Sequence, residues 1–239
     1  MILNILSLQI ISSATIQKRK VKMNTLNIVG PDFSTFVRSI EMICKLKSLP
    51  YSLQNQWQDT DVTLGSEGLL KLHPYGKVPV LIDGDFILPE SNAIARYLDT
   101  VAGPSVFASD TKQAALIDAW SSMLSIYGYR DLISLYVLTL KFPANQDGTP
   151  CLEALEKGKQ AAHSTLKILA EKYKSQNKKT NWFLGEQFTL VDAILLPMLD
   201  YIHSLEGDLN LLNQYPELKR YYQAAFEYPH CNEVLSFNS

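Results

Sequence analysis

The chain has 239 residues, of which 46% are hydrophobic and 19% are charged, so it can bury a core and is not a disordered polypeptide. Its formal net charge is -2. Nucleic-acid-binding domains are typically strongly basic, so we expect no nucleic-acid partner. The three cysteines form no CxxC pair, which argues against a disulfide scaffold or a structural zinc site. A reducing, cytoplasmic location is the simpler expectation.

The N-terminal segment is the only candidate for a membrane span. Residues 1–16 are largely apolar, but a spanning helix needs about 20 such residues. Their positive cluster, residues 18–22, follows the apolar stretch, whereas a secretory signal carries its charge first. We predict no stable membrane span. We interpret residues 1–22 as an extension of the folded domain, or as residues that are included because the translation start is misplaced upstream of Met23. A signal peptide, a reverse-oriented anchor and an amphipathic presequence are the alternatives.

The next part of the chain alternates between strand and helix patterns. The expected elements are a strand at 26–29, a helix at 34–47, a strand at 51–53, a weak helix at 60–72, a hairpin at 78–88 and a helix from 91. A strand–helix–strand unit followed by a hairpin and a helix is typical of a small α/β domain whose first two strands are parallel.

The pattern changes after Gly103 and Pro104. Long helical periodicities follow, at about 110–140, 150–176, 189–204 and 215–227, with no convincing strand. The sequence therefore predicts an α/β domain at 23–102 and an all-helical domain at 109–239.

Two short segments of the α/β half suggest a binding site. Pro79 interrupts an apolar strand run, which indicates an edge, a bulge or a special turn. A cis bond after Val78 would leave the backbone of Val78 free to pair with an extended peptide. Glu90 and Ser91 precede a periodic helix. Ser91 suits an N-cap, but the same helix start can hold a carboxylate while Glu90 receives an ammonium group.

The segments 73–81 (HPYGKVPVL) and 88–98 (LPESNAIARYL) resemble the glutathione-binding core of soluble glutathione S-transferases. The segment 188–193 (FTLVDA) is similar to the buried capping box of that family's helical domain. The resemblance spans about residues 24–230, and His73 departs from the family's usual Asn. It implies a thioredoxin-like domain followed by an all-helical domain, and a homodimer.

The resemblance also implies roles for individual residues. Val78, beside a cis-Pro79, pairs its backbone with the cysteinyl part of glutathione, while Glu90 and Ser91 hold the γ-glutamyl end. Lys77 reaches the glycine carboxylate, or is a solvent-facing lysine of a strand edge. Glutathione would be a co-substrate, and no other cofactor is implied.

Members of the family activate the glutathione thiol with a Tyr, Ser or Cys near the start of the first helix. This chain offers Ser34 and Thr35 there. We favour Ser34 as the hydrogen-bond donor, with Thr35 as the alternate. Capping of the helix alone is the competing interpretation for both residues, and Asp32 would oppose a thiolate if it pointed inward.

A second substrate would lie between the two halves. The aromatic residues Trp120, Tyr127 and Tyr129, with Arg130, are expected to line its pocket, although such a stripe is more often core or dimer contact. His163 and His203 lack ligand spacing, so we predict no metal.

The implied activity is a detoxification reaction, in which a bound glutathione thiolate attacks a small electrophile. Two alternatives remain open: a glutathione-dependent isomerase or peroxidase of the same fold, and a non-catalytic binding or assembly module.

Overall fold

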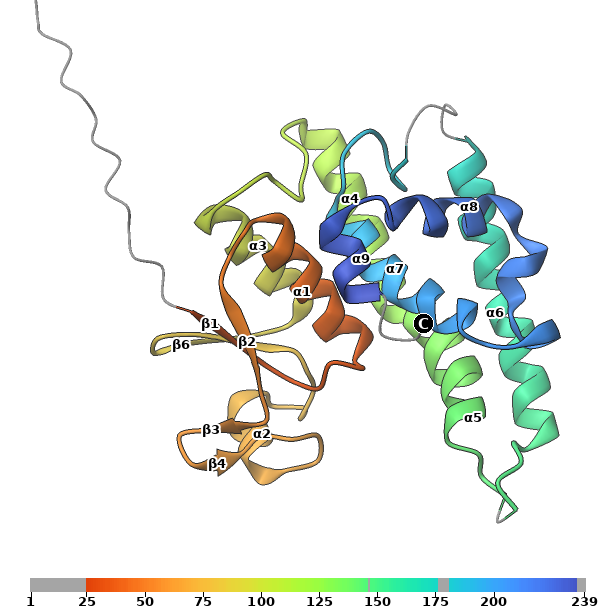
Figure 1. Cartoon of the computed structure of the whole chain (residues 1–239), viewed down its shortest axis with the longest axis horizontal. Coiled ribbons are helices and arrows are strands. Elements are labelled where there is room, and N and C mark those ends of the chain that lie inside the picture. The colour runs from red at the N-terminus through yellow and green to blue at the C-terminus, as the bar shows by residue number, and fades with distance from the viewer. Residues whose placement is uncertain (1–24, 146, 176–180, 236–239) are drawn as a thin grey trace, which may run out of the picture.

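An α/β half and a helical half lie side by side in the protein (Figure 1). The computed structural model describes residues 25–145, 147–175 and 181–235; the predicted extension at 1–22 lies outside them. Helix α1 (Thr35–Leu46) packs between the sheet and the helices of the second half. The expected fold class, a mixed-sheet domain followed by a helical domain, is confirmed.

The main sheet has four strands in the order β2-β1-β5-β6. Its strands are β1 (Leu26–Val29), β2 (Tyr51–Gln54), β5 (Val80–Asp83) and β6 (Phe86–Pro89). Strand β1 runs parallel to β2 and antiparallel to β5, while β5 and β6 form an antiparallel hairpin. The parallel first pair and the hairpin were both expected from the sequence.

The region expected to be a weak helix at 60–72 is divided into two structures. A short hairpin, β3 (Gln56–Trp57) with β4 (Thr60–Asp61), precedes helix α2 (Glu67–Leu72). The helix begins late because Ser66 is its N-cap, with Oγ accepting from the N–H of Leu69 at 3.1 Å.

Alternation along the strands separates the two faces of the sheet. Ile28 and Leu81 belong to the large core cluster, which also contains Ile40 of α1 and Ile94 of α3 (Ser91–Val101). Neighbouring residues point to the opposite face, where Leu69 of α2 joins Val29, Val80 and Ile82 in a smaller cluster.

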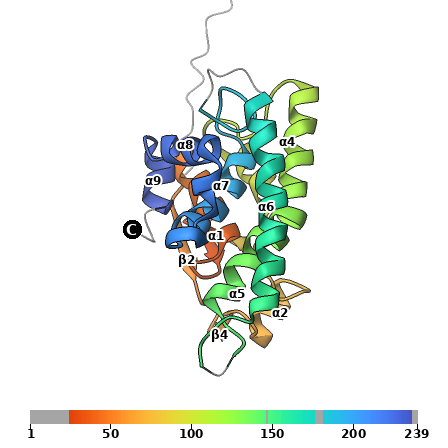
Figure 2. The same cartoon turned by 90° about the vertical axis from the view of Figure 1, so that its right-hand side faces the viewer.

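The helical half begins with a long continuous helix. Its parts are α4 (Thr111–Met123), a π-helical segment η1 (Leu124–Val137) and α5 (Leu138–Lys141). Helix α6 (Leu152–Ser175) runs alongside it (Figure 2). The backbones approach closely at Gly158, where a Cβ atom would lie 2.1 Å from the carbonyl oxygen of Leu135. A side chain at Gly158 would therefore push the two helices apart.

The remaining helices surround α7 (Leu190–His203), which is buried along most of its length. They are η2 (Gly207–Leu209), η3 (Leu211–Gln214), α8 (Pro216–Ala225) and α9 (Pro229–Leu235). Asp192 is fully buried near the start of α7 and accepts hydrogen bonds from the N–H groups of Thr189 and Phe183. Thr189 and Asp192 form the capping box that the sequence predicts.

Candidate functional site

A cavity of about 1030 Å³ lies where the α/β half meets the long helix and α7. Its volume is at the upper end of the range that small-molecule sites usually occupy, about 300–1,000 Å³. The α/β half contributes most of the polar lining residues, Ser34, Thr35, His73, Lys77, Glu90, Ser91 and Asn92, together with the apolar Phe33, Phe36, Leu64, Val78 and Pro79; this side is called the polar wall. The opposite wall is mainly apolar and includes Ile126, Tyr129, Ile133, Val137, Leu138 and Phe142. The cavity can therefore hold a polar molecule beside an apolar one.

The bend before β5 presents an unpaired backbone to the cavity. The peptide bond between Val78 and Pro79 is cis. Among the described residues, no main-chain group bonds to the N–H or C=O of Val78. Gly30, at the end of β1, has φ of 139°, and a Cβ there would lie 2.9 Å from Cβ of Val78. Glycine thus allows β1 to end directly against Val78, whose free N–H and C=O can pair with an extended peptide.

The turn from β6 into α3 is the second polar feature. Helix α3 begins at Ser91, so Glu90 rather than Ser91 occupies the N-cap position, which corrects the expectation from the sequence. Glu90 has φ of 75°, and its side chain makes no capping hydrogen bond. Because no side chain caps this helix start, its N–H groups are available to a ligand carboxylate.

The side chain of Glu90 lies beside a histidine of the cavity wall. Nε2 of the buried His73 lies 3.4 Å from Oε1 of Glu90, and Nδ1 of His73 accepts from the N–H of Tyr75. Since Nδ1 is the acceptor, the proton of neutral His73 is on Nε2, which faces the carboxylate. The Glu90 carboxylate itself remains largely exposed and is free to receive a ligand ammonium group.

Ser34 and Thr35 both line the cavity at the start of α1. Ser34 is the N-cap, and its Oγ accepts from the N–H of Val37 at 3.4 Å. This contact uses one lone pair of the hydroxyl and leaves its proton available to a ligand. Thr35 is buried. Asp32, which would oppose a nearby anion, is exposed and does not line the cavity.

The residues expected to hold a second substrate lie elsewhere, with one exception. Tyr129 lines the cavity and packs on Phe36, with ring centroids 5.1 Å apart. Trp120, Tyr127 and Arg130 do not line it. The ring of Trp120 packs on Phe183, Tyr127 faces solvent, and Arg130 pairs with the neighbouring Asp131.

The geometry of the long helix explains this error. An α-helical period of 3.6 residues places Trp120 and Tyr127 on one face and Tyr129 on the opposite face. The i→i+5 bonds of a π-helix give more residues per turn, and the cavity-lining positions Ser125, Tyr129, Ile133 and Val137 recur every four residues. Sequence periodicity alone does not reveal such winding. Tyr201 of α7 was also missed, because it belongs to no motif.

Two tyrosines, Tyr129 and Tyr201, line the cavity. Burial raises the pKa of Tyr129. Burial also raises the pKa of Tyr201, against the opposing effect of the nearby Arg38 guanidinium. Both phenols therefore stay protonated at neutral pH, and the Tyr201 hydroxyl donates to the carbonyl oxygen of Phe33. The described residues contain no group of three potential metal ligands, and no described helix is long and apolar enough to cross a membrane.

Comparison with known families assigns both halves of the chain. The family model for the glutathione S-transferase N-terminal domain matches residues 29–105, and that for the C-terminal domain matches residues 153–224. The chain belongs to the soluble glutathione S-transferase family. The polar wall of the candidate site lies in the first matched region, and Tyr201 lies in the second.

Individual members of the family are distant relatives. Glutathione S-transferase 3 of Zea mays is 28% identical over 189 residues, which cover 74% of this chain and 79% of that protein. A probable elongation factor 1-gamma of Arabidopsis thaliana is 27% identical over 175 residues, and this chain spans only 40% of its length. The crystal structure of poplar glutathione transferase F1 superposes with a TM-score of 0.74, covering 90% of this chain and 98% of that one, at 23% identity. The structural likeness supports the fold, and the names show that the family includes proteins other than transferases.

Proposed function

We propose that this protein is a glutathione transferase, which binds glutathione along the polar wall and joins it through its thiol sulfur to an apolar electrophile. The observation that carries the proposal is a free backbone edge at Val78 and a helix start at Glu90 and Ser91 that no side chain caps, both facing an apolar wall across one cavity. Glutathione is a short anionic peptide with an ammonium group at one end, which complements these features.

The polar wall suits a particular orientation of the tripeptide. The cysteinyl backbone would pair with Val78, which directs the thiol toward Ser34. The γ-glutamyl carboxylate would meet the N–H groups at the start of α3, and its ammonium would meet Glu90. Lys77 is exposed at the cavity edge and has no carboxylate within salt-bridge distance among the described residues, so it is free for the glycine carboxylate.

The chemistry proposed for this site is thiol activation. The thiol proton leaves to solvent, and the remaining thiolate accepts a hydrogen bond from the Ser34 hydroxyl. The positive end of the α1 dipole favours the same anion. The thiolate then forms a carbon–sulfur bond with an electrophile held against the apolar wall, and the electrophile's leaving group departs with the bonding electrons. Tyr129, as a protonated donor on that wall, is placed to bond a polar atom of the second substrate.

The test is the Ser34→Ala variant. Losing a hydrogen bond to a charged acceptor costs about 1.5–3 kcal/mol, so the pKa of the bound thiol should rise by roughly one to two units. Turnover at neutral pH should fall by a factor of about ten to a hundred, while glutathione affinity changes little. Thiolate absorbance against pH, with glutathione bound, measures the effect. An unchanged titration would move the role to Thr35 or to backbone N–H groups.

Two control variants separate this effect from loss of structure. Ser66→Ala removes the equivalent N-cap of α2, where Oγ also accepts a backbone N–H, and should not alter the thiol. Ser91→Ala should weaken glutathione binding without shifting the titration, because it contacts the γ-glutamyl end.

A binding or assembly module is the second candidate, supported by the elongation factor relative and by a stringent starvation protein A homologue of Haemophilus ducreyi, 24% identical. Such a module would bind partners without turnover. A panel of aryl halide, enone, isothiocyanate and hydroperoxide substrates distinguishes the two candidates, and also separates transfer from peroxide reduction. Glutathione binding without turnover of any of them would favour the module.

A further inference from the structure

Helix α7 of the helical half contacts the start of α1 through two consecutive residues. The Asp200 carboxylate pairs with the guanidinium of Arg38 at 2.5 Å, and both side chains are buried. The Tyr201 hydroxyl donates to the carbonyl oxygen of Phe33 at 2.5 Å. These bonds bracket Ser34, since one lies a single residue before it and the other four residues after it. The second domain therefore fixes the segment that carries the candidate catalytic hydroxyl.

The Phe33 carbonyl is a sensitive point of this segment. The turn that leads into α1 is closed by one bond of its own, from the N–H of Ser34 to the carbonyl of Pro31. The ring of Phe33 is 50% exposed, so side-chain packing contributes little to holding the turn. The carbonyl of Phe33 belongs to the same peptide unit as the N–H of Ser34. The bond from Tyr201 therefore restrains the orientation of the Phe33–Ser34 peptide plane, and with it the direction of the Ser34 side chain.

Tyr201 is well placed to hold that peptide rigidly. Its ring lies 5.6 Å from the guanidinium carbon of Arg38, and Arg38 is itself held by Asp200 and by the carbonyl of Val234 in α9. Tyr201 also lines the cavity. The network of Arg38, Asp200 and the Val234 carbonyl thus supports the Tyr201 ring, while the Tyr201 hydroxyl bonds to the turn before α1.

We infer that Tyr201 is a positioning residue for the reaction, which aligns the Ser34 hydroxyl with the glutathione sulfur through the Phe33–Ser34 peptide. This inference rests on the proposed function. Hydrogen-bond strength falls steeply with misalignment, so a turn free to rotate would weaken the bond from Ser34 to the thiolate. Supporting groups of this kind commonly decide whether a catalytic group is held within the tolerance that its reaction needs.

The test is Tyr201→Phe, which removes the donor and keeps the ring against Arg38. We expect the pKa of the bound glutathione thiol to rise by about 0.5–1 unit, so the thiolate fraction below that pKa falls by a factor of about three to ten. Glutathione affinity should change less than about threefold, because Val78, Glu90 and Ser91 are untouched. Amide hydrogen exchange of residues 33–36 should become faster in the free protein.

Tyr222→Phe is the matched control. The Tyr222 hydroxyl donates to the other oxygen of the Asp200 carboxylate at 2.6 Å, so its loss weakens the same interface without reaching the turn. It should lower the melting temperature and leave the thiol titration unchanged. If both variants shift the titration equally, or Tyr201→Phe does not shift it, the inference is overturned.

The same measurements separate this inference from the proposed function. If glutathione bound to the wild-type protein shows no thiolate near neutral pH, the proposed function is wrong and the inference about Tyr201 is wrong with it. If the wild type shows the thiolate and Tyr201→Phe titrates identically, the proposed function stands and only the inference is lost.

Discussion

Glu90 combines an unfavourable backbone with a position in the candidate site. Its φ of 75° is unusual for a residue with a side chain, and such conformations cost on the order of 1–3 kcal/mol. They persist where function or the surrounding structure requires them. Glycine would adopt this backbone without strain, but it would lose the carboxylate that faces His73 and the cavity.

Two substitutions at this position isolate the backbone effect. Both Glu90→Gly and Glu90→Ala remove the carboxylate, but only glycine relieves the positive φ. We expect the glycine variant to exceed the alanine variant in free energy of unfolding by about 1 kcal/mol. Urea unfolding of both variants measures the difference, and equal stabilities would contradict a strained turn. Both variants should weaken glutathione binding similarly, because each lacks the acceptor for its ammonium group.

The sequence predicted those site residues that are close to one another along the chain. Val78, Glu90 and Ser91 lie within fourteen positions and carry a recognisable motif, and all three line the cavity. The cap position was assigned to Ser91 because residue type does not reveal the φ of Glu90. Tyr201 was not predicted, since its contact with Phe33 joins residues 168 positions apart.

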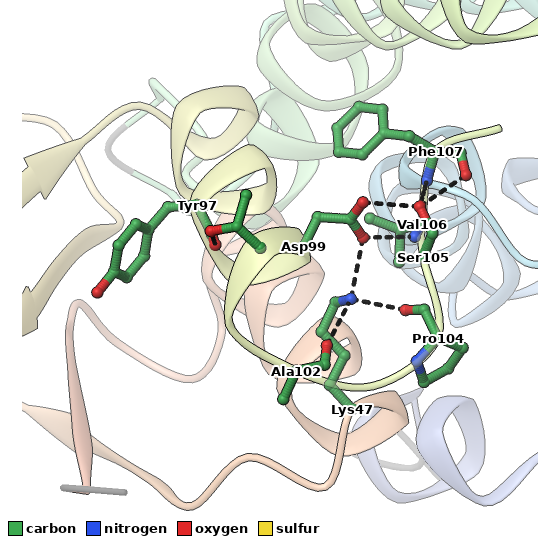
Figure 3. A network of polar contacts seen from close by, with 9 residues as sticks. Lys47, Tyr97, Asp99, Ala102, Pro104, Ser105, Val106 and Phe107 are labelled. Atoms are coloured by element: carbon green, nitrogen blue, oxygen red, sulfur yellow. Dashed lines mark hydrogen bonds and ion pairs between the residues drawn. The ribbon is translucent and has the colours of Figure 1, made fainter. Parts of the chain in front are cut away.

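At the scale of elements, the buried ammonium group of Lys47 links the end of α1 to the end of α3. The side chain of Lys47 is fully buried and donates to Asp99 and to the carbonyls of Ala102 and Pro104, as Figure 3 shows. Its three N–H donors therefore all have partners. Asp99 also accepts from Ser105 and from the N–H of Val106. The segment that follows α3 is therefore held against the α/β half by these hydrogen bonds.

This cluster predicts a specific acid dependence of stability. Partial burial by itself raises the pKa of Asp99, but hydrogen bonds from Ser105, Lys47 and the Val106 N–H outweigh it and lower that pKa below its ordinary value. A depressed carboxyl pKa stabilises the folded state above the unfolded pKa of about 3.9 and loses this contribution as pH falls through the folded value. The wild type should therefore lose stability from this source below about pH 4.

Asp99→Asn tests this dependence. At pH 7 the variant should lose about 1.5–3 kcal/mol of unfolding free energy, because Lys47 remains buried without its counter-ion. The difference between the two proteins should shrink as pH falls from about 5 to 3. Urea unfolding across that range measures it. A difference that stays constant with pH would show that the carboxylate charge is not the source.

Element-scale prediction succeeded where a period was regular and the segment was long. The strands of the main sheet, α1, α3, α6 and α7 all lie close to their expected ranges. Helix α9 was not predicted, because seven residues are too few to show a helical period. The long helix was predicted, but its π-helical winding was not, and the helix face toward the cavity was misassigned.

At the scale of the whole molecule, the two halves share one core. A single cluster of buried residues includes Leu26 and Ile40 of the α/β half together with Leu195 and Leu199 of α7. The buried ion pair of Arg38 with Asp200 crosses the same junction. Because α1 is packed against both the sheet and α7 (Figure 1), the cavity lies between two surfaces that are held together, as precise alignment of a catalytic group requires.

The outer face of α4 and η1 carries exposed apolar side chains that this core does not cover. They are Leu116, Met123 and Tyr127. Leu116 and Met123 are seven residues apart on one side of α4, and Tyr127 follows about one turn later in η1. Contiguous exposed apolar residues of this kind are typical of interaction surfaces, and interfaces between permanent partners are more apolar than ordinary surface.

We predict that this face pairs with the same face of a second copy, so that the protein is a homodimer. Light scattering at micromolar concentration should give about twice the chain mass, since stable interfaces of standard size form complexes at such concentrations. The double variant Leu116→Glu with Tyr127→Glu should give a mass near that of one chain, because two like charges would face their counterparts across the interface. Neither residue lines the cavity, so glutathione affinity should be retained.

Ile168→Glu, at another exposed apolar side chain on α6, is the control and should leave the mass unchanged. A wild-type mass of a single chain would contradict the prediction, and a dimer that survives the double variant would move the interface to another face.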